Sequence, residues 1–184
     1  MLYAVPSYSA RTLMSFTPGR GHEALRRNRW SSLGAEYFLT VCTENRAVGL
    51  ATPRLATAIL GQANQLTADG DWHLRTMTIM PDHMHLLIAL TGNSNLAFVM
   101  RRFKGRIVPH LRAAGLRWQR GYFDHRMRPD EDRFPVFMYI LLNPQRAELI
   151  APHEKWLWYR CVTEDWQWFE PLTTTDWSFP DWLP

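Results

Sequence analysis

The chain has 184 residues, 46% of them hydrophobic and 21% charged, a length that suits one compact domain and a composition that excludes a disordered chain. It contains no run of eighteen apolar residues, and its first fifteen residues lack the basic start and apolar run of a secretory signal, so we expect a cytoplasmic protein with no membrane partner. Cys42 and Cys161 lie far apart in sequence, fit no disulfide framework or Cys-x-x-Cys metal site, and are expected in the core.

The positive charge is concentrated in one segment. The formal net charge is +4, yet residues 101–128 hold nine Lys or Arg and one acid, which gives +8 there and −4 for the rest. Such a segment indicates a polyanionic partner, most often nucleic acid, and a merely solvated basic face is the alternative.

The first half of the chain predicts an arm, a strand and a helix. Residues 1–33 show no clean periodicity and end in a basic cluster, so we expect a basic N-terminal arm. Residues 37–43 are rich in β-branched and aromatic types and predict a strand. Residues 53–66 begin with a proline and repeat apolar positions at helical spacing, which predicts a helix.

The second half predicts a hairpin, a helix, a strand and a helix. Residues 72–80 and 83–90 read as antiparallel strands separated only by Pro-Asp. A helix with one apolar stripe and one basic face is predicted over 95–111, a fourth strand over 118–126, and a helix over 131–148 that Pro144 should kink or loosen.

This order of elements predicts an α+β fold, in which a ferredoxin-like antiparallel sheet has its helices packed on one face. We assign this domain to residues 34–153. Residues 154–184 hold six of the nine tryptophans and six acids against two basic residues, so we expect an acidic, Trp-rich tail that packs over another surface.

Two histidines lie two residues apart in a predicted strand. His83 and His85 therefore point to the same face and are able to approach one metal ion. Histidines in a strand are also common as ordinary core or surface residues. The flanking apolar residues place the pair on a buried central strand, where an imidazole without a partner is costly, and this favours ligation.

Tyr139 and Asn143 lie four apart on the last predicted helix, hence on one face. A tyrosine there is more often a core residue than a catalyst. Phenol is a poor nucleophile at its usual pKa of about 10, but a cation that polarises a scissile phosphate offsets this weakness. Asn143 is a candidate third, oxygen ligand.

Four motifs resemble those of single-tyrosine transposases. The run MPDHMHLLI at 80–88 is similar to their His-hydrophobic-His (HUH) motif, and 118–125 and 139–146 resemble their fourth strand and catalytic helix. Residues 19–29 and 37–40 resemble the REP-associated branch, known as RAYTs.

The resemblance implies an HUH nuclease fold and a single-stranded DNA endonuclease and strand transferase that acts at REP-type hairpins with Mg²⁺ or Mn²⁺. Tyr139 would be the nucleophile, forming a 5′-phosphotyrosine link and freeing a 3′-hydroxyl. His83 and His85 would be metal ligands, and Asn143 would take the third position. We expect a monomer; a dimer stays open, since some relatives build each site from two subunits.

Residues predicted to contact DNA come from the arm, the basic segment and the last helix: Arg20, Arg26, Arg27, Arg29, Arg101, Arg102, Lys104, Arg106, Arg120, His125 and Arg146. For His125 the alternative is a structural histidine at a strand edge. For Arg146 it is a solvated arginine at a helix end.

Two departures from the family pattern are visible. Asn143 stands where more mobile relatives often have glutamine, which reaches further, and 155–160 reads KWLWYR where the REP-associated branch commonly shows Trp-Pro-x-Ser-Ser. Two other functions stay open. One is a hairpin DNA-binding protein of the same fold that does not cleave; the other is a zinc hydrolase of unrelated fold, which needs another histidine or carboxylate beside the pair.

Overall fold

In the part of the chain that the structure describes, the sheet that carries the histidine pair has five strands: β1 (Glu36–Cys42), β2 (Trp72–Ile79), β3 (His83–Leu90), β4 (Phe123–Arg126) and β5 (Tyr159–Cys161). Their order across the sheet is β4-β1-β3-β2-β5, and every neighbouring pair is antiparallel. The α+β antiparallel fold predicted from the sequence is thus confirmed, and β3 occupies the centre of the sheet.

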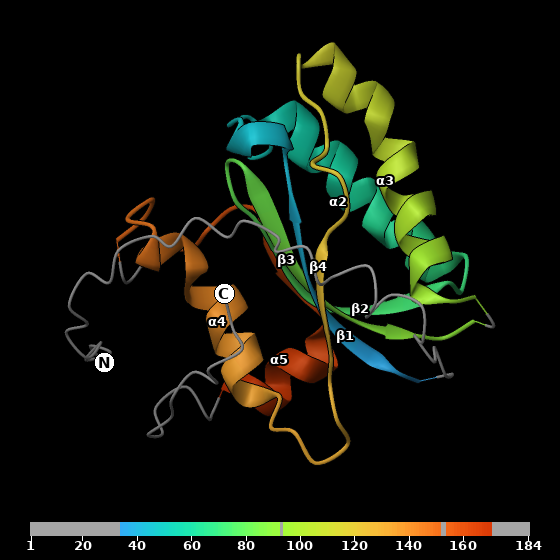
Figure 1. Ribbon diagram of the computed structural model, residues 1–184. Helices are drawn as coiled ribbons and strands as arrows, with labels where there is room; N and C mark the ends of the chain where they lie inside the picture. The colour runs from blue at the N-terminus through green and yellow to red at the C-terminus, as the bar shows by residue number, and fades with distance from the viewer. Residues whose placement is uncertain (1–33, 93, 152–153, 171–184) are drawn as a thin grey trace.

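The computed structural model describes residues 34–92, 94–151 and 154–170 (Figure 1). The predicted arm lies outside the described residues, and with it four of the predicted DNA contacts, Arg20, Arg26, Arg27 and Arg29. Within the described ranges, no helix has the length and apolar character needed to cross a membrane.

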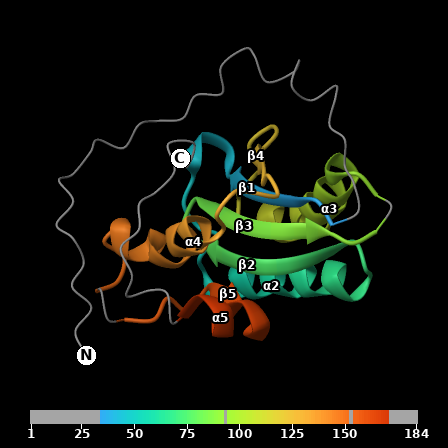
Figure 2. The same ribbon diagram turned by 90° about the horizontal axis from the view of Figure 1, so that it is seen from below.

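The helices are divided between the two faces of the sheet (Figures 1 and 2). α2 (Pro53–Ala68) and α3 (Leu96–Ala113) cover one face, while α4 (Phe134–Arg146) and α5 (Thr163–Phe169) pack on the other. We expected all helices on one face, so the position of the last predicted helix is corrected here.

The strands are apolar on both faces, which explains this division. Tyr37, Leu39 and Val41 of β1 belong to the core beneath α2 and α3. Phe38, which lies between Tyr37 and Leu39 in the sequence, is fully buried on the other face of the sheet, against α4. A strand with consecutive apolar residues is typical of burial on both sides. The central strand behaves likewise, since Leu86 and Leu87 belong to different cores.

The β2–β3 turn is tied to the loop that follows β1. The amides of Gly49 and Leu50 both donate to the carbonyl of Pro81, at 2.7 and 2.8 Å, and the amide of Thr43 donates to the carbonyl of Asp82 at 3.0 Å. This loop contains the 3₁₀ turn η1 (Glu44–Arg46). Loop and turn therefore form one unit at the end of β3 where the histidine pair lies.

The fourth strand is shorter than predicted. A continuous ladder with β1 forms only over Phe123–Arg126. The preceding segment has an isolated bridge between Trp118 and Thr43, and the Lys104 ammonium on α3 donates to the carbonyls of Gln119 and Gly121 at 3.0 and 2.8 Å. Gly121 has a φ of 82°, a conformation that a regular strand does not contain.

Part of the expected tail completes the domain instead. β5 pairs with the edge of β2, and the indole of Trp156 donates to the Ile79 carbonyl at 2.9 Å. In α5, Phe169 is fully buried and packs against Phe134 and Phe137 of α4. A three-residue strand carries too little periodicity to be read from sequence, and its pairing depends on the open edge of a distant strand.

Candidate active site

The two histidines of β3 converge as their spacing predicts. The Nε2 atoms of His83 and His85 lie 3.1 Å apart, and their rings meet at 79° with centroids 4.7 Å apart. The pair faces α4, on the opposite side of the sheet from α2 and α3.

His85 is held by a hydroxyl and by an aromatic ring. Its Nδ1 lies 2.9 Å from the hydroxyl of Thr40, which is its register partner on β1, and its ring stacks on Phe38 at 5.5 Å. Thr78 is its register partner on β2, but the Thr78 hydroxyl is buried without a hydrogen-bond partner. Burial, followed by the charges of neighbouring side chains, lowers the pKa of His85 well below its usual value, so the ring is neutral as ligation requires.

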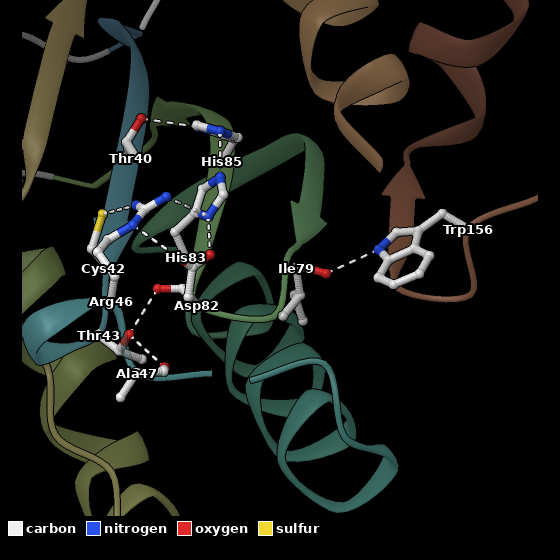
Figure 3. A network of polar contacts seen from close by, with 10 residues as sticks. All are labelled: Thr40, Cys42, Thr43, Arg46, Ala47, Ile79, Asp82, His83, His85 and Trp156. Carbon is white, nitrogen blue, oxygen red and sulfur yellow. Dashed lines mark hydrogen bonds and ion pairs between the residues drawn. The ribbon is translucent and has the colours of Figure 1, made fainter. Parts of the chain in front are cut away.

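His83 is held by charged groups (Figure 3). Its Nδ1 lies 2.6 Å from the Asp82 carboxylate and 3.3 Å from the guanidinium of Arg46, which also contacts the other Asp82 oxygen at 2.7 Å. Burial opposes ionisation of Asp82, yet the hydrogen bond from His83 and the positive charge of Arg46 hold its pKa below the usual value.

Tyr139 lies beside this pair. Its ring is 5.1 Å from the His85 ring, at 75°, and Phe38 contacts it at 5.8 Å. The side chain comes from α4, which crosses β2 and β3, and the residue is only 5% exposed. The juxtaposition of phenol and imidazoles on which the sequence argument depends is therefore present in one chain.

The phenol has two polar neighbours on its own helix. The Arg146 guanidinium lies 4.7 Å from the centre of the Tyr139 ring. Burial raises the pKa of Tyr139, while Arg146 and a hydrogen bond from Asn143 act in the opposite direction. Asn143, one turn after the tyrosine, is itself buried. Tyr139 is thus a protonated phenol with two neighbours that favour its ionised form.

The histidine pair fits a divalent cation. Two ligands about 2.1 Å from one ion at about 90° are about 3.0 Å apart, and the two Nε2 atoms are separated by 3.1 Å. Their Nδ1 atoms are engaged elsewhere, as in most histidine metal ligands. Across the described ranges no group of three His, Cys, Asp or Glu side chains is able to hold a metal, so the closed site of a zinc hydrolase is not formed there.

The predicted DNA contacts on α3 lie on the other face of the sheet, and several have partners. Arg102 binds the carboxylates of Asp69 and Asp71, and Arg106 lies 3.2 Å from Asp69. Lys104 is held by the carbonyls described above. Arg101 and Arg120 are exposed. The basic segment is therefore partly neutralised by acids that precede β2, which sequence counting within the segment misses.

His125 is bound by a carboxylate. Its Nε2 lies 2.8 and 3.0 Å from the two oxygens of Glu131, and its register partner on β1 is Phe38. The structure therefore places this histidine in the structural setting that was the alternative to DNA contact. Arg146, by contrast, is exposed next to Tyr139.

Sequence reasoning missed four residues that organise the site: Phe38, Thr40, Arg46 and Asp82. Asp82 had a signal in the sequence, since it directly precedes His83, but the Pro-Asp pair was interpreted only as a turn. The other three come from β1 and the following turn, and their proximity depends on the pairing of β1 with β3.

The chain also matches known proteins. Residues 31–127 match the family described as "Transposase IS200 like". This match spans more than half of the chain, and the chain belongs to that family of transposases. Its class is accordingly that of a DNA-processing enzyme.

Within that class the chain is similar to two REP-associated tyrosine transposases. One from Haemophilus influenzae is 23% identical over 138 residues, covering 67% of this chain and 77% of the relative. A solved structure of a REP-associated tyrosine transposase bound to a REP hairpin has a TM-score of 0.65 and 21% identity, covering 85% of this chain and 96% of that one, and shares its fold. The resemblance predicted from the motifs is confirmed.

Proposed function

We propose that this transposase is a metal-dependent single-stranded DNA endonuclease and strand transferase that acts at REP-type hairpins through a 5′-phosphotyrosine intermediate. The observation that carries the proposal is the Tyr139 ring 5.1 Å from His85, whose Nε2 faces that of His83. The hairpin-bound relative of the same fold supports a hairpin as the DNA element recognised.

In the proposed reaction, the Tyr139 oxygen attacks the phosphorus of a phosphodiester. The bond between phosphorus and the tyrosine oxygen forms while the bond to the 3′-oxygen of the leaving strand breaks. The phenol loses one proton and the leaving oxygen gains one, so the products are a 5′-phosphotyrosine and a 3′-hydroxyl. One phosphodiester replaces another, so a 3′-hydroxyl is able to reverse the step without ATP.

The side chains divide this work between them. His83 and His85 would hold Mg²⁺ or Mn²⁺, with Asn143 as an oxygen ligand, and the bound ion would polarise the scissile phosphate. Arg146, against the Tyr139 ring, favours the ionised phenol and offers a positive charge to the phosphate. Asn143 donates to the phenol oxygen and so orients it.

DNA would be held by the exposed arginines around this centre and on the opposite face. Arg146 is the candidate at the site itself, and Arg101 and Arg120 are candidates outside it. Arg102 and Arg106 would contact DNA only by leaving Asp69, so we assign them a smaller part.

The test is covalent trapping. The full chain is incubated with REP-type hairpin oligonucleotides and Mn²⁺, and we expect a protein–DNA adduct that resists denaturation, is absent with chelator, and is not formed by Tyr139→Phe. Tyr122→Phe is the matched control, because Tyr122 is partly buried against the core under α2 and α3, and it should form the adduct. Absence of an adduct across varied hairpins, with binding retained, would favour the non-cleaving DNA-binding protein instead.

A further inference from the structure

Arg46 reaches the histidine pair from the turn after β1, and each of its three guanidinium nitrogens has a close neighbour there (Figure 3). Its Nε contacts Asp82 Oδ2 at 2.7 Å, its Nη1 donates to the Cys42 sulfur at 2.9 Å, and its Nη2 lies 3.3 Å from Nδ1 of His83. The Arg46 side chain is 52% exposed, yet its guanidinium lies against Asp82, Cys42 and His83.

These contacts decide which nitrogen of His83 carries its proton. Asp82 Oδ1 lies 2.6 Å from Nδ1, and an ionised carboxylate only accepts, so the proton is on Nδ1 and the lone pair is on Nε2. Arg46 only donates, so its Nη2 makes no hydrogen bond to the protonated Nδ1, and Arg46 acts on His83 through its contact with the second oxygen of Asp82. Arg46 therefore fixes the carboxylate in the orientation that directs its first oxygen at His83.

The backbone holds Arg46 in place independently of any ligand. Asn45 and Arg46 have φ angles of 54° and 55°, a left-handed conformation that is uncommon for arginine. The Thr43 hydroxyl lies 2.8 Å from the Ala47 carbonyl and 2.9 Å from that of Asp82, so the turn is fastened to the residue that its arginine binds. Strained backbone of this kind is typical of functional sites.

We infer that Arg46 and Asp82 form a clamp that keeps His83 in the tautomer with Nε2 free for a metal, which makes Arg46 a positioning residue of the site. The inference rests on the proposed function, which supplies the ligand, a divalent cation. It adds to the site a residue that lies outside both the His83–His85 motif and the helix of Tyr139. Carboxylates that hold a ligand histidine in this way commonly change metal affinity about 10- to 100-fold when they are replaced.

The first measurement is Mn²⁺ affinity of the full chain without DNA, by electron paramagnetic resonance. Arg46→Gln and Asp82→Asn should bind Mn²⁺ about 10-fold more weakly than the unsubstituted chain. Arg46→Lys keeps the positive charge but loses the planar set of guanidinium donors. Its Mn²⁺ affinity should therefore lie between the affinities of these two variants and that of the unsubstituted chain. Arg54→Gln is the matched control, because Arg54 is an exposed arginine on α2, and it should bind Mn²⁺ normally.

The second measurement reads the tautomer directly, from the imidazole ¹⁵N shifts of the metal-free chain. His83 should be in the Nδ1-protonated form, and in Arg46→Gln and Asp82→Asn a larger share should carry the proton on Nε2. Variants that keep both the tautomer and the Mn²⁺ affinity would overturn the clamp. Failure of the unsubstituted chain to bind Mn²⁺ would instead refute the proposed function, and the ¹⁵N spectrum would still decide whether the clamp sets the tautomer.

Discussion

The ring of Tyr139 stands edge-on to the imidazole of His85, with 75° between their planes and Phe38 in contact with both. Tyr139 reaches this position from α4 and His85 from the central strand, so the relationship is created by the packing of that helix on the sheet. It places the proposed nucleophile beside the two proposed metal ligands, which is the arrangement that a phenol requires to attack a phosphodiester.

Thr40→Val should weaken Mn²⁺ binding. Thr40 and Thr78 flank His85 on the two neighbouring strands, but only the Thr40 hydroxyl contacts its Nδ1. Loss of that contact frees the ring to change orientation or tautomer, and we expect an affinity about 10-fold lower in a Mn²⁺ titration.

Thr78→Val is the matched control for this substitution. The Thr78 hydroxyl is buried without a hydrogen-bond partner, so its replacement by a methyl group should leave Mn²⁺ binding unchanged and stability unchanged or higher. Equal effects of the two substitutions would show that the Thr40 contact has no special role.

Stability of the metal-free chain should fall as the pH drops below about 6.5. Burial is the main reason that the pKa of folded His85 lies well below 6.5, its value in the unfolded chain. Below that pH the unfolded state takes up a proton that folded His85 does not, so the stabilisation present above 6.5 is lost as the pH falls toward the folded pKa.

Urea unfolding in the presence of chelator, at about pH 7.5 and about pH 5.5, measures this effect. The single group should cost about 1 kcal/mol over that interval. His85→Gln removes the titrating group. Between the two pH values, the free energy of unfolding of this variant should therefore fall by about that much less than the free energy of unfolding of the unsubstituted chain. Identical losses in the variant and the unsubstituted chain would be inconsistent with a neutral, buried His85.

Asp165→Asn should destabilise the fold more than a neighbouring substitution does. Arg75 of β2 binds both Glu36 and Asp165, and Asp165 is the residue through which α5 joins this network. Removing its charge leaves a half-buried guanidinium short of a partner, with an expected loss of about 1–3 kcal/mol. Glu164→Gln, one residue earlier and exposed, should stay within about 0.5 kcal/mol in the same urea measurement.

Arg102 and Arg120 should separate stability from DNA binding. Arg102 binds Asp69 and Asp71, so Arg102→Ala should lower the free energy of unfolding and change hairpin affinity little. Arg120 is exposed, so Arg120→Ala should leave the free energy of unfolding unchanged. It should lower the slope of log affinity against log salt for hairpin binding by about one, the value for one lost phosphate contact. The opposite pattern would show that Arg102 leaves its two carboxylates to bind DNA and that Arg120 does not contact DNA.

The parts of the site that depend on local patterns were predictable from the sequence. The spacing of His83 and His85 and the Pro-Asp turn fixed a hairpin whose second strand begins and ends as predicted, at 83 and 90. The spacing of Tyr139 and Asn143 likewise placed both on one helical face. These features need only the periods of a strand and a helix.

The parts that depend on distant pairing were not predictable. Which face of the sheet α4 covers is decided by its connection and by the apolar residues on both faces of β1. The partners of Arg102 come from another loop, and Arg46 lies in a turn whose sequence gives no sign that it will meet Asp82. β5 pairs only because β2 offers an open edge.

The most direct test of the central claim is to identify the residue that becomes joined to DNA. A trapped adduct is digested with protease and nuclease, and the modified peptide is sequenced by mass spectrometry. We predict a nucleotide attached through its 5′-phosphate to Tyr139, and the released strand should end in a 3′-hydroxyl. Attachment to any other residue, or a link through a 3′-phosphate, would contradict the account.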